Sequence, residues 1–188
     1  MNFEQDIENA LVALRAGGTI LYPTDTIWGL GCDATNEKAV ADIYRIKQRD
    51  DSKALIILVA DEREIMQYVA APDPAAFIFL EQQAKPTTMI FDGAIGLAEN
   101  LVASDGSIAI RICHDSYCRH LLRRLRKPLV STSANRSGQP SPQVYGDISK
   151  EIVGAVDYVA YHRRDEMTPA SPSAIYRWKD GEALVIRP

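Results

Sequence analysis

Long hydrophobic runs are missing from this sequence. The longest uninterrupted apolar stretch, 54–60, has the length of a strand, whereas a membrane-spanning helix needs ~18–20 such residues. The N-terminus is acidic and amphipathic, unlike the basic and then apolar start of a secretory signal peptide. We therefore expect a protein that does not enter a membrane.

Cysteine is also scarce, and Cys32, Cys113 and Cys118 cannot all pair with one another. Their spacing matches no zinc-binding pattern, so no metal site is expected. Reduced thiols that fill the core are the simplest account, and reduced thiols favour a cytoplasmic protein.

Neither sign of charge dominates. The 188 residues include 21 Lys and Arg against 25 Asp and Glu, for a formal net charge of −4. This balance argues against a protein that coats nucleic acid through bulk positive charge.

No internal repeat or low-complexity linker is present, and a chain of this length supports one good core. We expect residues 1–188 to form a single domain.

Helical and strand-like patterns alternate along the chain. Apolar residues recur at helical spacing in five segments, 2–16, 36–47, 61–68, 73–83 and 114–126. Short apolar runs typical of strands occupy eight segments, 19–22, 54–60, 87–91, 107–112, 129–131, 157–160, 174–178 and 183–187. The alternation predicts an α/β fold, and the cluster of late strands predicts a mixed sheet. Ligands of such folds bind at loops beyond strand ends, which here are the loops 23–34 and 132–142.

The loop after the first predicted strand contains Pro-Thr-Asp-Thr-Ile-Trp-Gly-Leu-Gly at residues 23–31. Its hydroxyls and carboxylate stand beside glycines that let a ligand approach the backbone, although the same residue types make ordinary turns. Residues 29–34 also fit the dinucleotide fingerprint G-x-G-x-x-A. That fingerprint should directly follow a strand and open a helix. Here six residues separate it from the strand, which argues against a nicotinamide cofactor.

A cationic segment surrounds the end of the second predicted helix and contains Lys47, Arg49 and Lys53. Side chains two positions apart do not share a helical face, so Lys47 and Arg49 can converge only where the helix ends. Three cations at such a point suit a polyphosphate, which Arg binds by a bidentate fork and Lys as a point charge. Taken alone, the segment is better explained as a solvated helix C-terminus, where the helix dipole favours cations.

Residues 131–142 are rich in hydroxyl and amide groups. They include four serines, one threonine and one asparagine, and no large apolar side chain. These groups suit phosphate oxygens or an adenine edge, although a surface loop has the same composition. The sequence contains no Walker-type phosphate loop and no Ser–His–Asp pattern. An enzyme built from these loops would work by positioning and charge stabilisation rather than through a covalent intermediate.

Arginines stand out at two further places. Arg111 lies in the predicted strand 107–112. Successive side chains of a strand point to opposite faces, and this alternation alone predicts that Arg111, between apolar neighbours, faces solvent. The predicted helix 114–126 carries a basic face, which is either an RNA-binding surface or, more simply, the solvated side of an amphipathic helix; it comprises Arg119, Arg123, Arg124 and Arg126.

Taken together, the three polar segments resemble the YrdC family of threonylcarbamoyl-AMP synthases. The resemblance rests on five segments in the family's order, which are 22–34, Lys47-x-Arg49 with Lys53, 108–111, 129–138 and 185–188. They span nearly the whole chain, and the ordered set is specific although each segment alone is weak. The resemblance implies a twisted, open α/β sheet with flanking helices and a central, positively charged cavity.

The resemblance also implies an activity. Members join L-threonine, bicarbonate and ATP into threonylcarbamoyl-AMP with release of pyrophosphate, and Mg²⁺ would accompany ATP. Downstream transfer proteins would then use the product to modify tRNA next to the anticodon. By the match of motifs, the threonine-binding residues would be Thr26, Arg111, Ser131 and Ser173. The ATP-binding residues would be Arg49, Lys53, Ser107, Ser133, Ser141 and Arg187, and the catalytic signature would comprise Lys47, Arg49, Ser133 and Asn135.

The sequence departs from the family pattern at two places. Residues 84–89 lack the glycine of the usual Trp-Pro-Gly-Pro-x-Thr stretch, and residues 172–175 replace the usual S/T-T-V. Two alternatives remain. One is a module of the same fold that binds tRNA or double-stranded RNA through the basic face and has no synthase activity. The other is a paralogue that acts on a different carbamoylated or acylated nucleotide.

Overall fold

The computed structural model describes residues 1–48 and 55–188, and the predicted site residues Arg49 and Lys53 lie outside these ranges. The described helices are α1 (Phe3–Arg15), α2 (Glu37–Lys47), α3 (Glu62–Tyr68), α4 (Pro74–Glu81), α5 (Ser116–Leu125) and α6 (Lys150–Ala155). The first five confirm the sequence prediction to within two residues at each end. The sequence missed α6, because six residues are too few to show a helical period.

The described strands form one mixed sheet. They are β1 (Ile20–Tyr22), β2 (Gly29–Gly31), β3 (Ile56–Val59), β4 (Thr87–Phe91), β5 (Ile108–Ile112), β6 (Leu129–Ser133), β7 (Tyr158–Val159), β8 (Ala174–Lys179) and β9 (Glu182–Arg187). Their order in the sheet is β7-β1-β2-β6-β3-β5-β4-β8-β9. The sheet contains both parallel pairs, such as β3 with β5, and antiparallel pairs, such as β3 with β6. The mixed α/β prediction is confirmed.

The strand β2 corrects the prediction that residues 23–34 are entirely loop. Glycine is a poor strand former, so Gly-Leu-Gly shows no strand signal, yet Leu30 is fully buried and the segment pairs on both sides. The strand β6 also runs two residues further than predicted and pairs Ser133 with Gly29 and Thr132 with Leu30. Two loops that the sequence presents as separate therefore meet in neighbouring strands.

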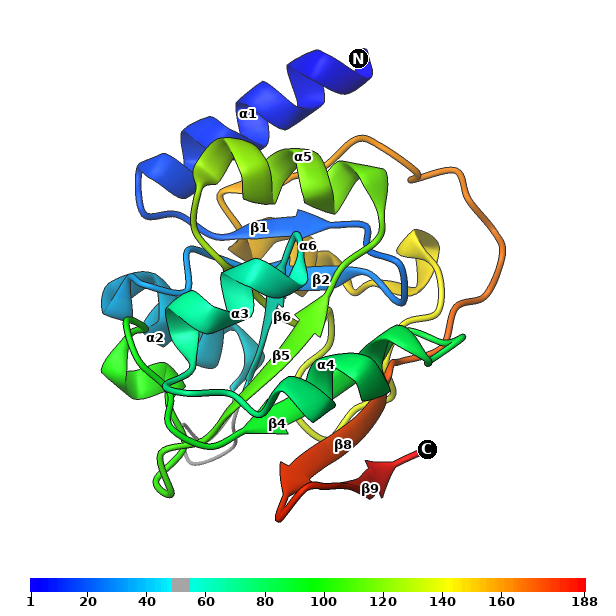
Figure 1. The fold of residues 1–188 in the computed structure, drawn as a ribbon. Coiled ribbons are helices and arrows are strands. Elements are labelled where there is room, and N and C mark those ends of the chain that lie inside the picture. The colour runs from blue at the N-terminus through cyan, green and yellow to red at the C-terminus, as the bar shows by residue number, and fades with distance from the viewer. Residues whose placement is uncertain (49–54) are drawn as a thin grey trace.

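The helices lie on the sheet as Figure 1 shows. Helices α1 and α5 run side by side, and Arg124 of α5 forms ion pairs with Glu4 at 2.5 Å and Glu8 at 2.7 Å of α1. Helices α3 and α4 lie in front of the middle strands, and the β8–β9 hairpin ends the sheet far from β1. In the described part of the chain, no helix has both the length and the hydropathy to cross a bilayer.

The three cysteines are free and buried, as predicted for thiols that fill the core. Burial raises the pKa of the Cys32 and Cys118 thiols above the ordinary value. Because only a thiolate is strongly nucleophilic, burial disfavours the reactive form of these two side chains.

The close packing of β2 against β6 depends on Gly31. A Cβ atom at this position would lie 2.1 Å from the carbonyl oxygen of Val130 and 2.8 Å from the ring of Tyr22. We predict that Gly31→Ala lowers the free energy of unfolding by about 1–3 kcal/mol or more, as overpacking does in a rigid interior. The matched control is Gly146→Ala, whose Cβ meets nothing within 4 Å. Urea unfolding measures the free energy of unfolding of both variants, and equal values would contradict the close packing at Gly31.

Candidate functional site

The C-terminal end of α2 contacts the hydroxyl-rich segment that follows β6. Helix α2 ends at Lys47, and Gln48 leaves it in the left-handed region at φ 49°. The Lys47 side chain is 2% exposed, and its ammonium donates to the carbonyl oxygens of Ser133 at 2.5 Å and Asn135 at 2.7 Å. The Ser137 N–H in turn donates to the Lys47 carbonyl at 2.9 Å. The cationic helix end and the hydroxyl-rich turn therefore lie against each other.

This arrangement gives Lys47 a clear structural role. A buried ammonium needs acceptors, and here backbone carbonyls of the turn supply two of them. The side chain thus fixes the backbone on which Ser133 and Asn135 stand. Its assignment to the phosphates of ATP remains a prediction.

Next to the turn lies a cavity of about 190 Å³ between β2, β6, β5 and the β8–β9 end of the sheet. Seven residues that the motif match assigned to ligands line it, namely Thr26, Arg111, Ser131, Ser133, Ser141, Ser173 and Arg187. They come from segments up to about 160 positions apart in the chain. The sheet therefore gathers the predicted threonine-binding residues and three of the predicted ATP-binding residues around one space.

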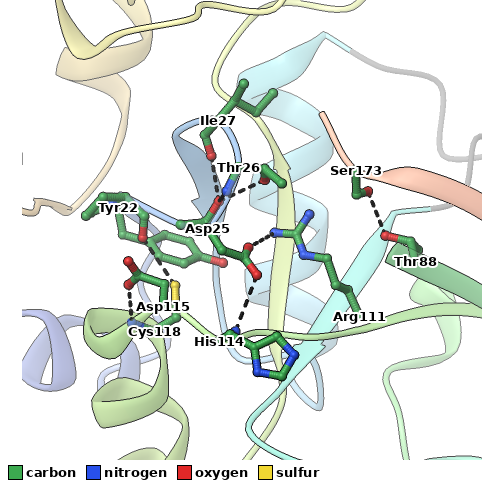
Figure 2. A network of polar contacts seen from close by, with 12 residues as sticks. Tyr22, Asp25, Thr26, Ile27, Thr88, Arg111, His114, Asp115, Cys118 and Ser173 are labelled. Carbon is green, nitrogen blue, oxygen red and sulfur yellow. Dashed lines mark hydrogen bonds and ion pairs between the residues drawn. The ribbon is translucent and has the colours of Figure 1, made fainter. Parts of the chain in front are cut away.

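Arg111 is buried at this cavity, which corrects the expectation from alternation that it faces solvent. Its side chain is 3% exposed, and its Nη2 lies 3.1 Å from Oδ1 of Asp25 (Figure 2). Alternation failed because β5 lies inside the sheet, between β3 and β4, where neither face is open to water. The carboxylate of Asp25 compensates the buried charge. The Nε–H of Arg111 is buried and has no partner among the described residues.

A second guanidinium lines the cavity at the end of β9. Arg187 donates through Nε and Nη2 to the carbonyl oxygen of Ser173, at 3.1 and 2.8 Å. Burial and the nearby positive charge of Arg111 lower the pKa of the Arg187 guanidinium. An arginine remains charged under such a shift. The cavity therefore brings together two cations beside one carboxylate, an arrangement that favours an anionic ligand.

Hydroxyl groups around the cavity are held in place by one another. Thr26 and Thr24 share a hydrogen bond of 3.0 Å between their Oγ1 atoms, and Thr24 donates to the carbonyl of Ile27 at 2.8 Å. Across the cavity, Thr88 and Ser173 are joined at 2.8 Å between their hydroxyls (Figure 2). Donors that are fixed before a ligand arrives need no reorganisation when it binds.

Besides Lys47, two further assigned side chains lie outside the cavity lining, those of Ser107 and Asn135. The Ser107 hydroxyl donates to Asp105 at 2.6 Å. The amide nitrogen of Asn135 donates to the carbonyls of Arg136 at 3.0 Å and Gln139 at 2.7 Å. Its Oδ1 is buried and has no partner among the described residues. Their roles toward ATP remain predictions, as do those of Arg49 and Lys53 outside the described residues.

Two residues that shape the site received no role from the motif match, although the sequence analysis noted the carboxylate of Asp25. Trp28 lines the cavity and packs on Tyr145, with 4.9 Å between ring centroids, and Asp25 is the partner of Arg111. Both lie within the 23–31 motif, which was the available signal. The dinucleotide alternative is wrong, because Gly29 and Gly31 lie in strand β2 and open no helix.

The predicted RNA-binding face does not form one free surface. Arg123 and Arg126 are exposed, but Arg124 is engaged by Glu4 and Glu8, and these contacts raise its pKa. Arg119 lies apart, against a groove between α4 and α5 of about 580 Å³. An exposed pair of arginines alone is a weak basis for RNA binding.

The chemistry that the cavity can perform follows from its donors. Its described lining consists of hydroxyls, guanidiniums and apolar side chains, without histidine or carboxylate, and the described residues contain no group of three potential metal ligands. Such a site can bind and orient anions and stabilise negative charge that develops on them. Within the described lining it offers no strong general base.

Comparisons with known proteins found relatives of this chain. Residues 12–188 match the family model Sua5_yciO_yrdC, which is described as telomere recombination. A curated threonylcarbamoyl-AMP synthase from Idiomarina loihiensis is 34% identical over 163 residues, 84% of this chain and 86% of that protein. Another from Stenotrophomonas maltophilia is 33% identical over 157 residues, 82% and 84% of the two chains.

Solved structures with the same fold include Sua5 of P. abyssi complexed with L-threonine, at a TM-score of 0.86 and 20% identity. The match covers 100% of this chain and 55% of that one, so this chain spans little more than half of that protein. YciO of E. coli has a TM-score of 0.84 at 23% identity, over 99% of this chain and 89% of that chain. At these identities the structures establish the fold.

The contact between Lys47 and the turn can be tested by stability. We predict that Lys47→Met lowers the free energy of unfolding by about 2 kcal/mol or more, because two buried carbonyls lose a charged donor. Lys38→Met is the control, since Lys38 is exposed on the same helix and such changes usually stay within about 0.5 kcal/mol. Chemical denaturation checks both, and a Lys47 variant as stable as the control would show that the contact does not hold the turn.

Proposed function

The chain belongs to the Sua5, YciO and YrdC family, and on that premise we propose that it is a threonylcarbamoyl-AMP synthase. The reaction converts L-threonine, bicarbonate and ATP into threonylcarbamoyl-AMP, pyrophosphate and water. The observation that supports it most is the cavity in which Arg111 and Arg187 meet the hydroxyls of β6 beside the turn bound by Lys47. We propose further that residues 1–188 act as one domain and that the cavity is positively charged.

The motif match, together with the positions of the residues that line the cavity, supports the following roles. The threonine carboxylate pairs with Arg111, and the hydroxyls of Thr26, Ser131 and Ser173 surround the rest of the amino acid. ATP lies toward the turn, against Ser133, Ser141 and Arg187. Further contacts to ATP come from Arg49, Lys53 and Ser107, and Lys47 and Asn135 hold the turn that carries the phosphates.

The chemical steps suit a site without a strong base. The threonine amine and bicarbonate combine to a carbamate with loss of water. A carbamate oxygen then attacks the α-phosphorus and forms a P–O bond, while the bond to pyrophosphate breaks and its electron pair leaves with pyrophosphate. The carbamate is already an anion, so no side chain need remove a proton in the transfer step. The protein supplies orientation and cations that stabilise the spreading negative charge.

The remaining partners follow from the same chemistry. Mg²⁺ enters as part of the substrate, on the phosphate oxygens of ATP. The product is a mixed anhydride of a carbamic acid and AMP, a reactive carrier that a transferase for tRNA consumes next to the anticodon. We place this step in the cytoplasm. The alternative of an RNA-binding module without activity is less well supported, because Arg124 of its proposed face is engaged by two glutamates.

The proposed function predicts that pyrophosphate release from Mg·ATP depends on both L-threonine and bicarbonate. Arg187→Met should lower kcat/KM by about 10²-fold, the usual cost of losing one donor that stabilises transition-state charge. Arg45→Met is the control, because its side chain is 73% exposed and lies on α2 away from the cavity. A coupled assay measures pyrophosphate release by the wild-type protein and by both variants. Pyrophosphate release that does not depend on threonine, or no pyrophosphate release from the wild-type protein, would overturn the proposed function.

A further inference from the structure

The carboxylate of Asp25 lies behind Arg111, outside the cavity lining. Its side chain is 13% exposed, Oδ1 is 3.1 Å from Arg111 Nη2, and Oδ2 accepts the backbone N–H of His114 at 3.3 Å (Figure 2). Asp25 borders the groove between α4 and α5, whereas Arg111 borders the cavity. The ion pair therefore forms the wall between the two spaces, and Asp25 touches the ligand side only through Arg111.

The loop that carries Asp25 is fixed by contacts that do not involve Arg111. Arg163 donates from Nη1 to the carbonyl of Thr24 at 2.9 Å and lies 3.0 Å from Oδ2 of Asp115. The thiol of Cys118 lies 3.2 Å from the carbonyl of Pro23. Because the backbone just before position 25 is anchored to Arg163 and to Cys118 of α5, the carboxylate occupies a set place before any ligand binds.

Arg111, in contrast, depends on Asp25. Among the described residues its one charged partner is Asp25, through an ion pair in which Oδ1 accepts no hydrogen bond, and the Nε–H of Arg111 is buried and unpaired. A long side chain with a single polar contact loses its orientation when that contact is removed. A carboxylate that pairs with a guanidinium requires the planar group to be correctly turned, since the two hydrogen bonds are parallel.

We propose that Asp25 is a positioning residue, which holds the guanidinium of Arg111 turned so that its unpaired N–H groups receive the carboxylate of L-threonine. The inference rests on the proposed function and assigns a task to a residue that the motif match left without one. The net positive charge of the cavity then comes from Arg187, because Asp25 balances Arg111. Asp25 thus orients the Arg111 guanidinium, and it affects the binding of threonine rather than the binding of ATP.

The test is a double-mutant cycle on the full chain. Asp25→Asn should raise the KM for L-threonine roughly tenfold while kcat and the KM for ATP change less than about twofold, the pattern of lost substrate binding. Arg111→Gln should raise the same KM, and Asp25→Asn added to it should have almost no further effect, because Asp25 acts through Arg111. Calorimetric titration with L-threonine measures the same differences directly.

Asp33→Asn is the matched control, since Asp33 is 7% exposed and pairs with Lys127 at 2.5 Å away from the cavity. It should lower the melting temperature without changing the KM for threonine. If Asp25→Asn does not fold, Asp25→Glu replaces it. That variant displaces the carboxylate by one methylene and should also raise the KM for threonine alone.

Three outcomes would overturn the inference while the wild type remains active. They are an unchanged KM for threonine in the Asp25 variant, an equal rise in the KM for ATP, and additive effects in the double variant. If the wild-type protein neither releases pyrophosphate nor binds threonine, the proposed function fails and the inference fails with it.

Discussion

One buried ammonium joins the two polar segments on which the site depends. The Lys47 side chain reaches from the end of α2 to the carbonyls of Ser133 and Asn135. The residues just before that turn belong to β6, which pairs with β2, and β2 continues from the loop that carries Thr26. A helix end, two strands and two loops therefore form one connected frame around the cavity. The acceptors of the turn offset part of the cost of burying the Lys47 ammonium.

The charges of the site are arranged by the same frame. Arg111 comes from a central strand and Arg187 from the edge strand β9, yet their guanidiniums are close enough for one to lower the pKa of the other. Among the described residues, the carboxylate that pairs with either of them is that of Asp25, which borders the groove and not the cavity. Under the proposed function, the two guanidiniums give the cavity the positive charge that phosphate and carboxylate groups require. Such fixed cations stabilise a charge-spreading transition state without a catalytic base.

Much of this organisation could be predicted from the sequence because the helices are periodic and the motif segments are distinctive. The features that could not be predicted from the sequence are those that depend on residues far away in the chain. The strand β2 has no local strand signal and exists because Gly31 allows the close approach of Val130. The burial of Arg111 required knowing that β5 is central and that Asp25 lies beside it. Likewise, the sequence alone indicates a solvated helix end at Lys47, because it does not show that the turn at residue 135 packs against this side chain.

A crystal structure with L-threonine and a non-hydrolysable ATP analogue tests the central claim most directly. The threonine carboxylate should lie within hydrogen-bond distance of the Arg111 guanidinium, and the α-phosphate should lie beside the turn that Lys47 binds. Ligands in the groove between α4 and α5, or anywhere that leaves Arg111 and Ser133 uncontacted, would contradict the claim that this cavity is where the adenylate forms.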